Sequence, residues 1–83
     1  MVTVRVLYFG ALRDAVGLVE EALEVPAEVG TVGALATFLA SRHPAYADGR
    51  ASVRIARNEA FAADEEPLSN GDVIALIPPV AGG

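Results

Sequence analysis

Val73-Ile74-Ala75-Leu76-Ile77, followed at once by Pro78-Pro79, is the stretch of sequence that decides the fold. It is typical of a strongly apolar strand, and the two prolines end it because they lack backbone N–H groups and fix φ. At the other end of the chain, residues 2–9 alternate well enough for a first strand that is also strongly apolar. Two such strands are expected to lie side by side in the centre of one sheet, which makes the pair parallel.

The middle of the chain predicts one main helix. Thr31 is the expected N-cap, because its hydroxyl can accept a hydrogen bond from the first turn, and Pro44 stops the helix after residue 42. A shorter helical turn over residues 11–16 is expected to close at Gly17, a residue suited to a left-handed exit. The apolar stripe expected to face the sheet consists of Val32, Leu35, Phe38 and Leu39.

Three further strands complete the predicted fold. They are expected over residues 20–25, 53–57 and 60–62, and Gly71 supports a turn before the last strand because it readily takes positive φ. The order predicts an α+β fold of the β-grasp (ubiquitin-like) type, a mixed four- to five-stranded sheet with one main helix packed on one face. Residues 1–77 are expected to form this domain, and residues 78–83 a flexible C-terminal Gly-Gly tail.

Composition narrows the classes of function. The length of 83 residues suits one domain with one core. The formal net charge of −5 argues against binding to nucleic acid, which needs clustered basic side chains, and suits docking onto basic partners. There is no cysteine, and no apolar run approaches the roughly 18–20 residues that span a bilayer. We therefore expect a cytoplasmic protein without a membrane or metal site, whose start lacks a signal-peptide pattern.

Strand parity predicts an apolar patch on the face of the sheet away from the helix. If Val4, Val6, Ile74 and Leu76 face the helix, the alternate residues of the same strands face the other way. That face is expected to be polar in a sheet covered on one side only, so an apolar patch there usually marks an interface. The alternatives are that the loop after the first strand folds over the patch, or that the parity is shifted by one residue. Ala75 also faces away from the helix, and the predicted patch near the exit of the tail consists of Leu7, Phe9 and Ile77, joined by Phe61.

The composition of the last six residues favours a C-terminus that takes part in a reaction rather than a disordered chain end. Gly82 and Gly83 carry no Cβ, so another protein can close a narrow slot around them. The two prolines hold the residues that follow them extended. The segment predicted to insert into a partner is Pro79-Val80-Ala81-Gly82-Gly83. The alternative is a disordered chain end.

Three stretches of the sequence resemble the MoaD-type small subunit of molybdopterin synthase, a sulfur carrier of the MoaD/ThiS ubiquitin-like family. The resemblance begins at Val4, and residues 26–52 match only in pattern. Its most specific part is the ending Pro-Pro-Val-Ala-Gly-Gly after a strand that opens with Gly-Asp. The three stretches are residues 6–17, Arg57-Asn58 with the short strand after it, and residues 67–83.

The resemblance implies a role in molybdenum cofactor biosynthesis, with Gly83 as the reacting residue. An adenylyltransferase similar to ubiquitin-activating proteins joins the Gly83 carboxylate to AMP from ATP, and a sulfur donor displaces AMP to leave a thiocarboxylate. The large subunit of molybdopterin synthase receives the sulfur, with two carriers on a dimer of large subunits. The chain is then a non-catalytic sulfur-donor subunit of a sulfurtransferase, without a tightly bound cofactor. Arg13 is predicted to contact an acidic loop of the activating enzyme.

Other functions stay open on the sequence alone. The same carrier chemistry can send sulfur to tRNA thiolation or to the thiamine thiazole, or the tail can modify protein lysines. A β-grasp interaction module with an inert tail is the remaining possibility. The sequence identifies neither the cognate activating enzyme nor the sulfur source.

The remaining polar residues predict little chemistry. His43, at the end of the main helix, is interpreted as a polar helix-terminal residue rather than a metal ligand, since no second His or Cys lies near it in the sequence. Residues 64–66 are interpreted as a solvated acidic loop. Arg50, Arg54 and Arg57 form a candidate basic strip that guides the tail or meets ATP phosphates, the alternative being ordinary exposed arginines.

Overall fold

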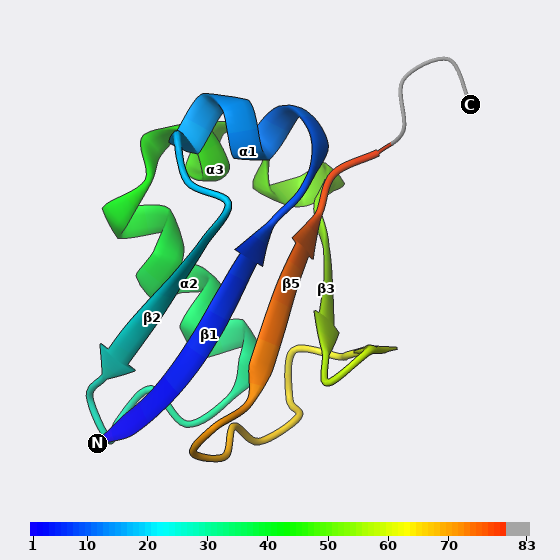
Figure 1. Cartoon of the computed structure of the whole chain (residues 1–83). Coiled ribbons are helices and arrows are strands. Elements are labelled where there is room, and N and C mark those ends of the chain that lie inside the picture. Colours follow the sequence, from blue (N-terminus) through cyan, green and yellow to red (C-terminus); the bar gives the residue numbers. More distant parts are fainter. Residues whose placement is uncertain (80–83) are drawn as a thin grey trace.

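The chain forms a mixed sheet with its helices gathered on one side (Figure 1). The structure is a computed structural model and describes residues 1–79. The strands are β1 (Val2–Tyr8), β2 (Glu20–Val25), β3 (Arg54–Arg57), β4 (Ala60–Phe61) and β5 (Val73–Ile77). The helices are α1 (Gly10–Val16), α2 (Val32–Arg42) and α3 (Pro44–Gly49), with a short 3₁₀ helix, η1, at Arg50–Ser52.

The first and last strands lie at the centre of the sheet and run parallel, as predicted. The strand order is β2-β1-β5-β3-β4, and β1 pairs with β5 from Arg5 opposite Val73 to Tyr8 opposite Leu76. The other three strand pairs are antiparallel. This is the predicted β-grasp arrangement, with five strands. Because β1 and β5 are parallel, both end at the same edge of the sheet (Figure 1).

The core lies between the sheet and α2, and the predicted strand parity is confirmed. Val4, Val6 and Tyr8 of β1 are buried, as are Ile74 and Leu76 of β5, while the residues between them are half-buried or exposed. The residues that α2 buries are Val32, Leu35, Ala36 and Leu39. The predicted stripe included Phe38 in place of Ala36. Phe38 is only half-buried. Its ring lies beside the exposed Arg42, whose guanidinium carbon is 6.0 Å from the ring centroid.

Residues 64–66 help to start α2, a role that the sequence did not predict. The predicted N-cap is confirmed, since the Thr31 hydroxyl accepts a hydrogen bond of 3.2 Å from the Ala34 N–H. The two preceding N–H groups of the first turn, of Val32 and Gly33, donate to carbonyl oxygens of the loop, at Glu66 (2.9 Å) and Asp64 (2.8 Å). The loop therefore satisfies helix-end groups that otherwise need water.

Pro44 does not only end α2; it also opens α3, a helix that the sequence analysis missed. Proline is favoured in the first turn of a helix because it has no N–H to leave unpaired there. His43 separates the two helices in an extended conformation, and Tyr46 of α3 is buried in the core. Among residues 1–79, no helix has the length and apolar character needed to cross a membrane.

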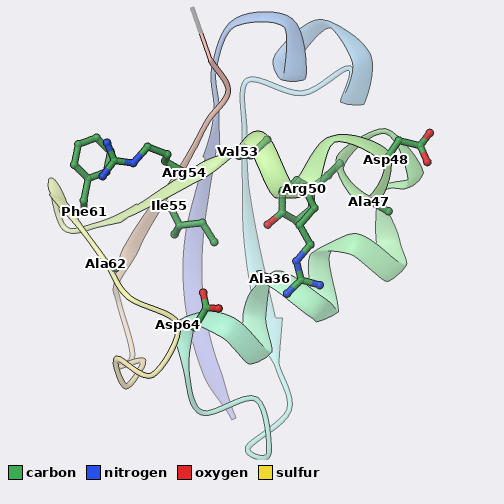
Figure 2. A pocket seen from close by; sticks show the side chains of 12 residues that line it. Ala36, Ala47, Asp48, Arg50, Val53, Arg54, Ile55, Phe61, Ala62 and Asp64 are labelled. Carbon is green, nitrogen blue, oxygen red and sulfur yellow. The ribbon is translucent and has the colours of Figure 1, made fainter.

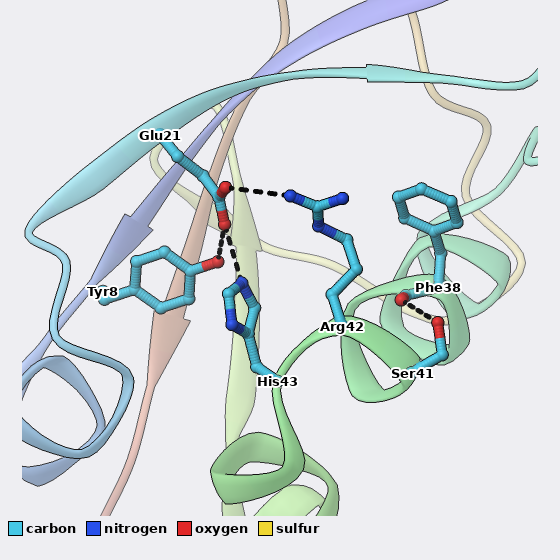
Figure 3. Close-up of polar contacts among 6 residues, drawn as sticks. All are labelled: Tyr8, Glu21, Phe38, Ser41, Arg42 and His43. Atoms are coloured by element: carbon cyan, nitrogen blue, oxygen red, sulfur yellow. Dashed lines mark hydrogen bonds and ion pairs between the residues drawn. The ribbon is translucent and has the colours of Figure 1, made fainter.

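A polar cluster ties the end of α2 to the first two strands (Figure 3). The Glu21 carboxylate accepts hydrogen bonds from the Tyr8 hydroxyl and from His43 Nε2 (2.8 Å), and Arg42 lies 3.6 Å away. Burial by itself raises the pKa of Glu21, but the two hydrogen bonds and the nearby positive charges outweigh it and lower that pKa overall. Burial, together with the bond to Glu21, raises the pKa of Tyr8. The structure thus gives His43 a partner within the fold.

Gly33→Ala is expected to destabilise the fold by a net of about 1–2 kcal/mol. A Cβ at this position would lie 2.9 Å from Asp64 Cβ and 3.2 Å from the Asp64 carbonyl oxygen. The clash outweighs the gain of about 1 kcal/mol that alanine brings over glycine in a helix. Urea unfolding measures the change. Gly49→Ala is the matched control because a Cβ there has no atom within 4 Å; a Gly33→Ala protein as stable as this control would contradict the prediction.

Candidate functional site

The chain leaves the sheet beside the turn that follows β1. β5 ends at Ile77, and the half-buried Pro78 packs against Gly10, where a Cβ would come within 3.3 Å of the Pro78 ring. Gly10 has φ +54°, in the left-handed region that favours glycine. The start of α1 and the segment that follows β5 are therefore held against each other, at the edge of the sheet where β1 and β5 end (Figure 1).

The reacting end itself lies outside the described residues. Pro79, the first residue of the predicted inserting segment, is exposed. The predictions made for Val80, Ala81, Gly82 and Gly83, including a flexible tail, fall on residues that the structure does not describe. What the structure defines is the surface from which the tail departs.

An apolar groove of about 340 Å³ lies on the open face of the sheet, next to that departure point. Phe9 and Phe61 are 45% and 57% exposed, unusually high values for large aromatic side chains. The groove brings together all four residues of the predicted patch, Leu7, Phe9, Phe61 and Ile77. Phe61 reaches it because Ala56 pairs with both Phe61 and Ala75 across neighbouring strands. We call this surface the exit groove; its lining consists of Leu7, Phe9, Ala56, Glu59, Phe61, Val73, Ala75 and Ile77.

The rest of the open face is polar, so the apolar character is local to the exit groove. Glu20 is paired opposite Leu7, and its carboxylate forms an ion pair with Arg5 of the same face. Farther along, Thr3 is paired opposite Glu24. The polar half therefore matches the expectation for a sheet covered on one side, whereas the half nearest the tail does not.

Asp72 anchors the β3–β4 hairpin, which carries Phe61, to the start of β5. This carboxylate is 4% exposed and accepts hydrogen bonds from Arg57 Nε (2.7 Å), Asn58 Nδ2 (2.9 Å) and the Ser69 N–H (2.7 Å). Asn58 also accepts a bond from the Val73 N–H and donates its own N–H to the Val73 carbonyl oxygen. The Asn58 side chain thus extends the pairing of β3 with β5 beyond the end of the strand.

The surroundings of Asp72 favour its charged form. Burial by itself raises the pKa of this carboxyl, but the hydrogen bonds from Arg57, Asn58 and the Ser69 backbone, with the positive charge of Arg57, outweigh it. The pKa of Asp72 therefore lies below its ordinary value. An ionised and fully bonded carboxylate fixes the hairpin, and with it one wall of the exit groove.

Arg13 and the predicted basic strip are placed differently from the exit groove. Arg13 is exposed in the last turn of α1 and lines a separate hollow beside the loop to β2. Arg57 is bound to Asp72, and Arg50 donates to the Thr37 hydroxyl (3.1 Å). Arg54 lies over the Phe61 ring with 3.6 Å between its Cζ and the ring centroid (Figure 2). The three arginines therefore have three different partners. Arg50 and Arg54 nevertheless line one hollow of about 610 Å³, to which Arg57 does not belong (Figure 2).

Sequence reasoning missed the residues that shape the site without lining it. Asn58, Asp72 and Gly10 all lie in the stretches that carried the family resemblance, but their roles depend on contacts across the fold. A carboxylate after a turn glycine signals a turn, and no local pattern shows that its partners lie 14 or 15 residues earlier. Within residues 1–79, no group of three or more His, Cys, Asp or Glu residues is placed to hold a metal ion.

The fold and the exit groove define a ubiquitin-like β-grasp protein whose last strand leads directly into a Pro-Pro segment beside an exposed apolar surface. The chain belongs to the ThiS family, which matches it over residues 6–83. It is 40% identical to the molybdopterin synthase sulfur carrier subunit of Mycobacterium tuberculosis, over 100% of both chains.

Two solved structures illustrate the likeness. A putative molybdopterin converting factor subunit 1 from Pyrococcus furiosus superposes with a TM-score of 0.83 at 34% identity, covering 96% of this chain and 100% of the other. A chain from the complex of subunits 1 and 2 of molybdopterin-converting factor from Helicobacter pylori has a TM-score of 0.70 at 24% identity, covering 98% and 99%. The predicted family and fold are confirmed.

Asp72→Asn is expected to destabilise the protein by about 2 kcal/mol at neutral pH, because it leaves Arg57 without its charged partner. The folded pKa of Asp72 is depressed, so its contribution is complete above the unfolded pKa of about 4 and is lost as the pH falls through the folded pKa. Urea unfolding at several pH values should show the difference between the two proteins shrinking below about pH 4. A difference of the same size at pH 7 and at pH 3 would contradict this.

Proposed function

We propose that this chain is a sulfur-carrier subunit that serves molybdopterin synthase and carries sulfur as a thiocarboxylate on Gly83. The observation that carries the proposal is the full-length relation to a molybdopterin synthase sulfur carrier subunit, combined with a last strand that leads into Pro-Pro-Val-Ala-Gly-Gly beside the exit groove. Among the described residues, those of the exit groove supply a docking surface, and the contact of Gly10 with Pro78 supports the start of the tail. The reacting group is the terminal carboxylate.

The chemistry follows from the reactivity of a carboxylate. Sulfur cannot displace oxide or hydroxide from it directly, since these are poor leaving groups. The Gly83 carboxylate therefore attacks the α-phosphorus of ATP within an activating enzyme, which releases pyrophosphate and forms a mixed anhydride with AMP. A sulfur nucleophile then attacks the acyl carbon and AMP leaves. The sulfur stays covalently tethered until it is delivered, so it is not lost by diffusion.

The reactions of the Gly83 carboxylate need catalytic groups on other proteins, and the tail must reach the sites that hold them. Six residues from Pro78 to Gly83 reach at most about 20 Å when extended, enough to enter a buried site in a neighbouring subunit. We infer that this site belongs to a large synthase subunit, in an assembly of two carriers on a dimer of large subunits. The complex of subunits 1 and 2 that includes the Helicobacter pylori chain supports a pairing of the carrier with a second, different subunit. ATP is consumed by the activating enzyme, this chain holds no tightly bound cofactor, and the pathway runs in the cytoplasm.

Loading of sulfur onto Gly83 is the first test. Incubation with the activating enzyme, ATP and a sulfur donor should raise the protein mass by one oxygen-to-sulfur exchange, measured by intact-mass spectrometry. Deletion of Gly83, or addition of one residue after it, should abolish the mass change and leave thermal unfolding unchanged. Sulfur transfer at the normal rate by either variant, or a mass that never rises for the wild type, would rule out the proposal.

Phe9→Arg is expected to weaken association with the large subunit by at least tenfold at unchanged thermal stability, because it puts a charge into the apolar surface that docks. Phe9 is 45% exposed in the free chain, so the fold itself loses little. Isothermal titration calorimetry measures the affinity. Ser41→Arg, at an exposed position of α2 on the helix side, adds the same charge away from the exit groove and from the hollow beside Arg54, and should bind normally. Equal affinity for the two variants would show that docking uses another face.

A further inference from the structure

Arg54 is a charged residue that borders the tail end of the exit groove through Phe61, while its own side chain lines the neighbouring hollow drawn in Figure 2. Arg54 is paired opposite Ile77, the last residue of β5, so it lies where the tail leaves the sheet. Its side chain is exposed and lies over Phe61, which lines the exit groove (Figure 2). A single arginine therefore borders both the apolar surface and the departure point of the tail.

The stacking on Phe61 holds the Arg54 guanidinium in place. A guanidinium plane on an aromatic face, here with 3.6 Å between Cζ and the ring centroid, is an attractive contact that restricts a long side chain. Stacking uses the face of the guanidinium and leaves the N–H donors at its edges free to bind a planar anion. Two parallel N–H groups fit a carboxylate in a bidentate geometry that a lysine cannot reproduce.

Arg54 has no acidic partner among the residues that the structure describes. Arg5, Arg42 and Arg57 each lie within 4 Å of a carboxylate oxygen, whereas the ion pairs of residues 1–79 do not include Arg54. The protein as a whole carries a net charge of −5. The positive charge of Arg54 beside the apolar docking surface is therefore opposite in sign to the net charge of the protein. Its pre-organised donors are complementary to a carboxylate brought by another molecule.

The charges at the two ends of the exit groove have opposite signs. Glu59 lines the groove at the tip of the hairpin, next to the start of β5, because the neighbouring Asn58 is bonded to Val73. Arg54 is opposite the end of β5, four residues farther along, or about 13 Å at the usual rise of a strand. A partner with an apolar surface and an acidic group can therefore meet this groove favourably in one direction only.

We propose that Arg54 is a specificity-determining residue of docking, which binds a carboxylate of the large synthase subunit at the edge of the exit groove. This bond, together with the opposite sign at Glu59, selects the orientation in which the tail enters the partner. The inference rests on the proposed function, since it assumes that the exit groove docks onto that subunit. It adds a requirement for the partner's surface, namely an Asp or Glu beside its apolar contact area.

The experiment compares Arg54→Gln with Arg50→Gln in binding to the purified large subunit at several salt concentrations. Both substitutions change the net charge from −5 to −6, so any effect of overall charge is the same in both. Arg50 lines the same hollow as Arg54 but bonds to Thr37, whereas Arg54 stacks on Phe61 of the exit groove. The comparison therefore removes the same charge from that hollow and differs at the edge of the exit groove. Arg54→Gln should weaken binding roughly tenfold relative to Arg50→Gln and reduce the salt dependence of the affinity.

Further variants separate charge from structure. Arg54→Lys keeps the charge and should retain the salt dependence while losing part of the affinity, because it cannot form the bidentate contact. All variants should unfold at the wild-type temperature, since Arg54 is exposed. Equal binding by Arg54→Gln and Arg50→Gln, or weaker binding by Arg54→Gln with unchanged salt dependence, would overturn the inference. So would failure of the wild type to bind the large subunit.

The sulfur-loading assay distinguishes a failure of the proposed role of Arg54 from a failure of the proposed sulfur-carrier function. If Gly83 gains sulfur normally and the Arg54 variants bind like the control, only the role of Arg54 is wrong. If Gly83 never gains sulfur, the proposed function is wrong whatever the binding data show.

Discussion

The parallel pairing of β1 with β5 is the constraint on which the rest of the structure depends. Parallel neighbours end at the same edge of a sheet, so the end of the chain leaves beside the turn that follows the first strand. That shared edge places Pro78 against Gly10 and puts Leu7 beside Ala75 on the open face. An antiparallel pairing of the same two strands would send the tail out at the opposite edge, away from Phe9.

The two faces of the sheet differ in composition, and only one of them forms the core. The face toward α2 holds the large buried residues of the central strands and is sufficient to form a core. The open face is polar over β1 and β2, where Arg5 and Glu20 pair, and apolar where β5 and the β3–β4 hairpin meet. Exposed apolar surface lowers the solubility of a free protein, and the proposed docking of the large subunit would cover the apolar part at the tail's end of the sheet.

Polar contacts around two carboxylates hold the short strand β4 and the corner between α2 and α3 in position. β4 contains two residues and depends on Asp72, Asn58 and Arg57 to keep the hairpin against β5. Glu21 does the same for the corner between α2 and α3, through Tyr8 and His43. Both carboxylates have lowered pKa values for the same reason, hydrogen bonds and positive neighbours that outweigh their burial. Acid therefore weakens both anchors together.

The sequence alone determined the β-grasp order, the parity of the central strands and the family. These follow from local signals: apolar alternation in residues 2–9 and 73–77, a capping threonine at Thr31 and the Pro-Pro-Val-Ala-Gly-Gly ending. The four residues of the predicted patch meet in the exit groove because side-chain direction in a strand has a period of two, which a sequence displays directly.

The tertiary structure alone decided which polar residues act together. Arg50, Arg54 and Arg57 are similar in sequence, yet one bonds to Thr37, one stacks on Phe61 and one neutralises Asp72. Likewise, Pro44 signals the end of one helix equally well whether or not another begins there. The physical reason is range: periodicity and caps act within a few residues, whereas the partner of a charge or an aromatic ring depends on strands brought together from distant parts of the chain.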